Sequence, residues 1–274
     1  MTAARRIDIA SGVPISTEIA KSIGVATGLS PEAVIRLVHS TGLRHIVQQD
    51  GMRFDAECSI AERMIEQPNL FLRDPLGTIL GPTLGAEQHH RFGMVFDAAE
   101  KKGLLLGPFG DFVAGLAGGR TIWDSALMIA DEFFTNASKN AWGSTSGLFQ
   151  GEPVHSGTIE FFAEANADLL VIGCRDTFGR LAVQNIVERI KACYDKGVAD
   201  SIRYGNSGAG IGSFMVFDAC MSYYAGVARG QSTVVCVAVP LGLSRRAVAA
   251  LPKNIHLLMH ANLKSVKDSV KDDE

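Results

Sequence analysis

The stretch TIEFFAEANADLLVIGCRDTFGRL, residues 158–181, says most about the fold. It holds two apolar runs, 158–165 and 168–176, whose length and composition are typical of strands. The short polar segment NAD joins them and suits a tight reversal of the chain. We therefore expect an antiparallel pair of strands that ends at Asp176.

Helical patterns flank this strand pair on both sides. In TIWDSALMIADEFFTNASKNAW, residues 121–142, apolar side chains recur on one stripe, which consists of Ile122, Ala126, Ile129, Phe133 and Ala137. Residues 181–197 form an amphipathic pattern, and a glycine-rich segment that opens a further helix and a terminal strand, STVVCVAVPL, follow. This order predicts an α/β (α+β) two-layer sandwich, in which helices cover a mixed sheet.

The segments outside this core have a different composition. Residues 17–49 read as two helices split by GLSPE, with Ser30 as N-cap and Pro31 in the first turn. Residues 50–120 are rich in Gly and Pro and contain one clear helical pattern, 56–67. We expect a mainly helical region over 1–118 for regulation or dimerisation, the sandwich domain over 119–250, and a C-terminal helix with a solvated tail over 251–274.

Composition narrows the classes of function. The chain has 274 residues, 47% hydrophobic content and a formal net charge of -3, so it lacks the basic excess of a nucleic-acid or anionic-membrane binder. It has no apolar run long enough to span a bilayer and no hydrophobic signal core, so we expect a cytoplasmic protein. The N-terminal helices resemble a helix-turn-helix, but the second helix has only Arg36 and His39 to contact a DNA groove. We therefore interpret them as two packed helices that could form a homodimer surface.

The five cysteines are odd in number, widely scattered and without a CxxC pair. This pattern gives neither a disulfide framework nor a zinc site, and free cysteines are among the most buried residue types. We expect buried, reduced thiols.

Polar residues interrupt the helix over 121–142 on one face. Glu132, Asn136 and Asn140 are spaced by four, so they project from the helix one turn above another, and Asp131 lies beside them. A carboxylate beside carboxamides suits a site that holds a divalent metal and phosphate oxygens. The alternative is that they form the solvated side of an amphipathic helix.

Two further segments contain residues that suit ligand binding. Asp176 at a strand end, next to apolar walls, is placed to accept a hydrogen bond from an exocyclic amine such as that of adenine, or it is simply a turn former. Gly208, Gly210 and Gly212 precede a helix, where backbone N–H groups can approach an anion. This segment lacks the Lys-Ser/Thr of a P-loop and the strand that a Rossmann fingerprint requires.

In combination, these segments resemble the Bergerat-type (GHKL) ATP-binding domain of gyrases, Hsp90, sensor histidine kinases, MutL and the anti-sigma-factor serine kinases. DEFFTNASKNA is similar to the N box of that family, DTFGRL to its first glycine box, GAGIG to its second, and STVVCVAVPL to its closing strand. The resemblance covers about residues 120–242 and is greatest for the compact anti-sigma-factor type.

The resemblance implies a role for each matched residue. Glu132 would be the general base, and Asn136 would bring Mg²⁺ to the phosphates of ATP. Lys139 and Asn140 would contact phosphate, and Asp176 and Thr233 would bind the adenine. Gly179 would let the base lie close, and the second glycine box would cradle the phosphates beneath a lid over about 190–207; the glycines of that box are Gly208, Gly210 and Gly212.

The first glycine box departs from the family pattern DxGxG, because Phe178 and Arg180 stand where glycines are usual. Phe178 could stack on the adenine or fill its place, and Arg180 could pair with a phosphate or face water. The resemblance implies an ATP-binding regulator, an anti-sigma-factor-like serine/threonine protein kinase that acts on a partner protein in bacterial signalling. The alternative is a non-catalytic module that binds a nucleotide or a partner.

Two other sites rest on histidines. A sensor histidine kinase needs a phosphoacceptor within an H-[ED]-x-x-x-P pattern, which none of the candidates begins: His39, His45, His89 and His90. A metal site could use His256 and His260, which are four apart, with His155, but the sequence places no third ligand.

Overall fold

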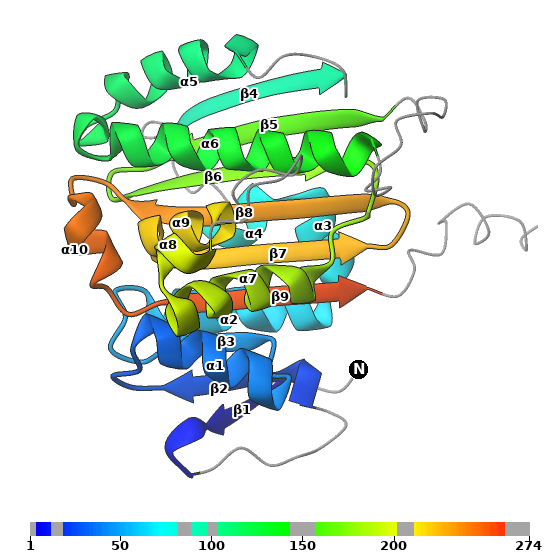
Figure 1. Ribbon diagram of the computed structural model, residues 1–274, viewed down its shortest axis with the longest axis vertical. Helices are drawn as coiled ribbons and strands as arrows, with labels where there is room; N and C mark the ends of the chain where they lie inside the picture. Colours follow the sequence, from blue (N-terminus) through cyan, green and yellow to red (C-terminus); the bar gives the residue numbers. More distant parts are fainter. Residues whose placement is uncertain are drawn as a thin grey trace, which may run out of the picture.

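The computed structural model describes residues 4–11, 19–81, 89–97, 103–142, 157–201 and 211–260. Nine strands form one mixed sheet in the order β1-β2-β3-β9-β7-β8-β6-β5-β4 (Figure 1). The strands are β1 (Arg5–Asp8), β2 (Ser22–Ala26), β3 (His45–Gln48), β4 (His90–Asp97), β5 (Thr158–Ala165), β6 (Leu169–Asp176), β7 (Ser222–Ala228), β8 (Ser232–Pro240) and β9 (Asn254–His260). The mixed sheet with covering helices is as the sequence predicts, but helices lie on both faces, whereas the predicted two-layer sandwich has them on one.

The expected strand pair is confirmed. β5 and β6 run antiparallel, with Ile159 opposite Asp176 and Ala165 opposite Leu170. The helices on either side are confirmed as α6 (Gly119–Trp142) and α7 (Val183–Lys196), and the terminal strand as β8. The apolar stripe of α6 is buried as expected, at most 5% exposed, and it packs over β6.

Helices cover the sheet in two layers. On the face toward the viewer in Figure 1 lie α1 (Pro31–Thr41), α6, α7, α8 (Val198–Ser201) and α9 (Gly212–Ala219). Behind the sheet lie α2 (Phe54–Glu66), α3 (Pro68–Arg73) and α4 (Pro75–Leu80). Helix α5 (Gly103–Gly115) packs on α6 beside β4, and α10 (Arg245–Ala249) lies near one end of the sheet.

The two-helix prediction for residues 17–49 is wrong in its first half. Ser22–Ala26 form β2, which is fully paired between β1 and β3. In the second segment Pro31–Thr41 form α1, but His45–Gln48 form β3 instead of continuing the helix. Ser30 caps α1, since its Oγ accepts from the N–H of Ala33, as predicted. Short apolar runs do not distinguish a buried strand from a helix, and the parallel β2–α1–β3 unit buries both faces of β2.

The sequence reading also missed β7 and mistook β9. The helix expected after the glycine-rich segment ends at Ala219, and Ser222–Ala228 form the buried strand β7. A helix was expected after residue 250, but Asn254–His260 form β9, parallel to β7; residues 261–274 lie outside the described residues. Central strands buried on both faces show no alternation of polar and apolar residues, so the pattern gave no strand signal.

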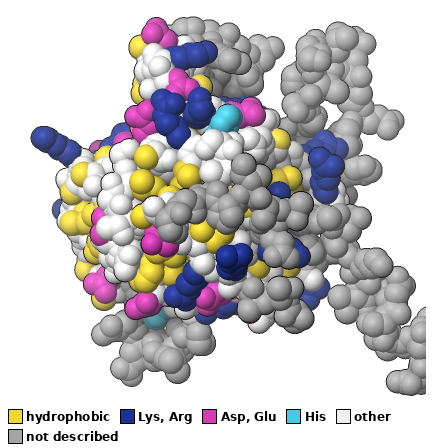
Figure 2. Space-filling view, turned by 90° about the horizontal axis from the view of Figure 1, so that it is seen from below, with side chains coloured by type: hydrophobic (Ala, Val, Ile, Leu, Met, Phe, Trp, Pro, Cys, Tyr) yellow, Lys and Arg dark blue, Asp and Glu magenta, His cyan; other side chains and the backbone are white. Residues whose placement is uncertain are grey.

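On the surface seen from below, basic and acidic side chains are mixed with apolar ones (Figure 2). Within the described part of the chain, no helix combines the length and the apolar character that crossing a bilayer needs. All five cysteines are free and buried, as expected.

Candidate functional site

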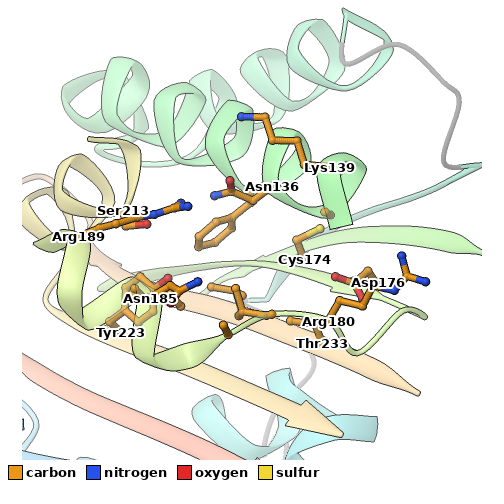
Figure 3. A pocket seen from close by; sticks show the side chains of 16 residues that line it. Asn136, Lys139, Cys174, Asp176, Arg180, Asn185, Arg189, Ser213, Tyr223 and Thr233 are labelled. Carbon is orange, nitrogen blue, oxygen red and sulfur yellow. The ribbon is translucent and has the colours of Figure 1, made fainter. Parts of the chain in front are cut away.

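A cavity of about 260 Å³ opens between α6, α7 and the strands that lie beneath them (Figure 3). Its walls come from α6, α7, the start of α9 and the segment after β6, and its floor from β6, β8 and β7. The cavity brings together four residues that the sequence singled out for nucleotide binding: Asn136, Lys139, Asp176 and Thr233.

Asp176 and Thr233 form one polar end of the cavity. They are direct partners in the antiparallel β6–β8 ladder and are 3% and 2% exposed. Oδ1 of Asp176 accepts from the N–H groups of Phe178 at 2.9 Å and Gly179 at 3.2 Å, which fixes the carboxylate at the strand end. Oγ1 of Thr233 is buried and has no hydrogen-bond partner among the residues that the structure describes. A buried hydroxyl without a partner at a cavity wall indicates a place for a polar ligand group.

Glu132 and Asn136 lie one turn apart on α6, toward the other end of the cavity. Nδ2 of Asn136 donates to Oε1 of Glu132 at 2.7 Å, which leaves the carbonyl oxygen of Asn136 for another partner. Asn136 lines the cavity, whereas the carboxylate of Glu132 packs against Gly212, the first residue of α9. A Cβ added to Gly212 would lie 2.0 Å from Cδ of Glu132, so a larger residue at this position would force the carboxylate to move.

Cationic and amide side chains surround the same cavity. Lys139 comes from α6, Arg180 from the segment after β6, and Asn185 and Arg189 from the inner side of α7. Figure 3 shows Arg189 and Ser213 at the end away from Asp176 and Thr233, with Lys139 above Asn136 on α6. The cavity is therefore polar at both ends and positively charged along its rim.

The floor between the two ends is apolar. Phe133, Val235 and the buried side chains of Cys174 and Tyr223 line it. Burial raises the pKa of the Cys174 thiol well above its usual range, with a smaller contribution from Asp176, and burial also raises the pKa of Tyr223. Both groups are therefore neutral at physiological pH, which suits contact with the flat face of an aromatic ring.

The altered first glycine box leaves the cavity open. Phe178 is 7% exposed in the hydrophobic core, its ring lies against Gly157, and it does not line the cavity. Gly179 has φ +58, and a Cβ there would lie 2.2 Å from the carbonyl oxygen of Ala228. Gly179 therefore packs against the β7–β8 turn, and its carbonyl oxygen accepts a hydrogen bond from the N–H of Gly230 in that turn.

Several of the residues predicted to bind nucleotide lie outside the described part of the structure. Asn140 lies in α6 but its side chain is outside the described part, and Gly208 and Gly210 lie wholly outside it. Of the lid expected over about 190–207, residues 190–201 form the end of α7 and α8, and the remainder is outside the described residues.

Four residues that line the cavity were not predicted from the sequence: Asn185, Arg189, Ser213 and Tyr223. Asn185 and Arg189 are spaced by four on α7, a signal that places both on one helix face. No comparable pattern points to Ser213 or Tyr223, which reach the cavity through the packing of α9 and β7.

The histidines of the alternative readings lie apart from the cavity. His39 is exposed on α1 and His90 on β4, whereas Nδ1 of His89 lies 2.7 Å from Glu164. His45 and His256 contact each other inside the protein. Of the other two proposed metal ligands, His155 lies outside the described residues and the side chain of His260 is not described.

No protein-family model matches the chain, and no curated protein matches it either.

Proposed function

We propose that the chain binds ATP or a closely related adenine nucleotide in the cavity beneath α6. The observation that carries this proposal is the pairing of Asp176 with Thr233 at one end of the cavity. Together they present a fixed carboxylate and a buried hydroxyl without a described partner, above a neutral floor of Cys174 and Val235. A carboxylate accepts from an exocyclic amine, and a hydroxyl both donates and accepts, so the two match the polar edge of adenine.

The opposite end of the cavity fits the phosphates and their cation. Arg189 and Ser213 would contact phosphate oxygens, while the carbonyl oxygen of Asn136, oriented by the bond to Glu132, would hold Mg²⁺. Mg²⁺, when bound, neutralises phosphate charge. The segment order α6–β5–β6–α7–α9–β7–β8 supports a Bergerat-type domain, in which the N-box helix faces the strand that carries the adenine-binding aspartate.

A protein serine/threonine kinase is the second candidate, favoured by the bond between Glu132 and Asn136. In that case Glu132 would accept the proton of a hydroxyl on a partner protein. The non-catalytic alternative keeps the nucleotide as a regulatory ligand. The closeness of Glu132 to Gly212, rather than to the cavity, favours nucleotide binding as the primary proposal.

Calorimetric titration with Mg-ATP tests nucleotide binding, with Asp176→Asn as the informative variant. Asn retains the oxygen that accepts from Phe178 and Gly179, so the turn persists, but it replaces the second carboxylate oxygen with a donor. We expect affinity to fall by about 10- to 100-fold, the worth of a hydrogen bond to a charged group. The matched control is Asp168→Asn in the exposed β5–β6 turn, which should bind as the wild type does. No binding by the wild type, or equal binding by Asp176→Asn, would contradict the proposal.

Phosphotransfer is tested separately with Glu132→Gln and radiolabelled ATP. If the chain is a kinase, this variant should retain nucleotide binding and lose at least about 100-fold of the phosphotransfer rate, as removal of a general base does. Binding without phosphotransfer in the wild type, to itself or to candidate partners, would leave the regulatory module as the function.

A further inference from the structure

A second group of polar side chains lies inside the protein on the α2 side of the sheet, where β3 meets β9. We call it the seam cluster, and each member is at most 1% exposed. Its members are His45, Glu57, Ser222, Tyr224, Asn254 and His256. They come from β3, α2, β7 and β9, so the cluster joins the N-terminal strands to the rest of the sheet.

The seam itself is short. β3 and β9 pair at two positions, His45 with His256 and Ile46 with Ile255, whereas β7 and β9 pair along seven. Two further bonds cross the seam, from the N–H of Leu257 to the carbonyl of Arg44 and from the N–H of Gln48 to Oδ1 of Asn254. The strands β1, β2 and β3 therefore join the sheet through few backbone bonds, and side chains contribute much of the connection.

The carboxylate of Glu57 organises the cluster. It accepts from Oγ of Ser222 at 3.0 Å, from the hydroxyl of Tyr224 at 2.9 and 2.8 Å, and from Nε2 of His256 at 3.1 Å. Burial acts to raise the pKa of Glu57, but His256, Arg53 and Tyr224 together hold it below its usual value. An ionised carboxylate has no proton to give, so Nε2 of His256 carries the hydrogen.

The other ring nitrogen of His256 faces His45. The two Nδ1 atoms lie 3.4 Å apart, and the hydrogen bond between them holds one proton. A neutral His256 with its hydrogen on Nε2 accepts at Nδ1, so Nδ1 of His45 donates to it. A further proton on His45 would make its ring a cation in a site where that side chain is 1% exposed. Burial lowers the pKa of His45 well below its usual value, and His256 and Arg44 lower it further. Arg44 acts on His45, Glu57 bonds His256, and the ring of Tyr224 stacks on His256. The other titratable or charged groups that interact with Glu57 are Arg53, Cys58 and Cys220.

We propose that His45 and His256 form an acid-sensitive latch, and that a proton taken up by His45 opens the seam between β3 and β9. The closed seam binds fewer protons than the open one, so its stability is complete above the ordinary histidine pKa and is lost as pH falls below it. With an open-state pKa of about 6.5 and a much lower one when closed, the opening constant rises about 30-fold between about pH 7.5 and 5.

Hydrogen–deuterium exchange of the full chain at several pH values tests the latch, after correction for the intrinsic exchange rate at each pH. We expect the opening constant of amides in 45–48 and 254–257 to rise about 30-fold as pH falls from about 7.5 to 5. Amides of the β6–β8 ladder should change by less than about threefold, because the described ladder contains no histidine. An equal loss of protection in both regions would overturn the proposal.

The variant His45→Gln separates the latch from general acid sensitivity. Glutamine can donate and accept hydrogen bonds but does not ionise, so the opening constant of the seam should no longer depend on pH. His39→Gln on the exposed side of α1 is the matched control and should keep the full 30-fold change. A pH dependence retained in His45→Gln would overturn the proposal.

Should His45→Gln not fold, the wild-type protein gives the answer through the imidazole NMR signals of His45. The proposal expects these signals to titrate only together with the loss of seam protection. Titration at the ordinary histidine pKa with the seam still protected would overturn it.

Discussion

The cavity and the seam cluster lie on opposite faces of the same strand, β7, where neighbouring residues take part in each. Tyr223 lines the cavity floor, and Tyr224 donates to Glu57 in the seam cluster. Both tyrosines are at most 3% exposed. Burial alone therefore does not distinguish a binding site from a structural cluster.

Hydrogen-bond satisfaction does distinguish them. The carboxylate of Glu57 accepts from three side chains and does not line the cavity beneath α6, so its hydrogen-bonding capacity is used within the fold. Thr233 is equally buried, yet its hydroxyl has no partner among the described residues and faces an open volume. Satisfied groups stabilise the fold, and unsatisfied groups at a cavity wall favour a ligand.

The largest effect is expected for Glu57→Ala. This change leaves the donors of Ser222, Tyr224 and His256 without their acceptor in a buried site. We expect a loss of about 3–5 kcal/mol in the free energy of unfolding, as for other broken buried ion pairs. Urea denaturation followed by circular dichroism measures it.

The matched control for that variant lies on the same helix. Glu62→Ala removes a partly exposed carboxylate that pairs with Arg6 on the surface, and it should cost less than about 1 kcal/mol. Comparable losses in the two variants would show that the seam cluster has no special structural role.

A smaller effect is expected where the cavity meets α9. Gly212→Ala places a methyl group against the carboxylate of Glu132, and we expect this overpacking to cost about 1–3 kcal/mol of stability. Adding Glu132→Ala to Gly212→Ala should recover most of the lost stability, because it removes the carboxylate that the new methyl group contacts. A double-mutant cycle of unfolding free energies measures this coupling.

Gly107→Ala in α5 is the control for the glycine change. A Cβ there meets no atom within 4 Å, so alanine should be neutral or slightly stabilising. An additive cycle, in which Glu132→Ala rescues nothing, would show that Gly212 does not pack on this carboxylate.

The sequence was most informative where patterns have a clear period. The stripe on α6, the β5–β6 pair and the amphipathic α7 follow the predicted bounds closely. The strands β1 to β4, β7 and β9 were not predicted. For β2, β7 and β9 the reason is that buried strands inside a sheet carry no alternation. Their place depends on long-range pairing, which a local pattern does not encode.

Part of the candidate site was predictable for the same reason. Asn136, Lys139, Asp176 and Thr233 occur in short segments whose combination resembles a known family, and the structure brings them to one cavity. The direction of Phe178 into the core was not predictable, since it depends on the space beside Gly157. The contribution of Tyr223 to the cavity floor was not predictable either, because it depends on where β7 lies in the sheet.

The most direct test is to measure the unfolding free energy and the Mg-ATP affinity of Thr233→Val together. Valine has nearly the same shape and removes only a hydroxyl that has no described partner. We predict unchanged or slightly higher stability and a loss of about 5- to 10-fold in affinity, the worth of one hydrogen bond. A loss of stability with unchanged affinity would contradict the central claim, because the hydroxyl would then serve the fold and not a ligand.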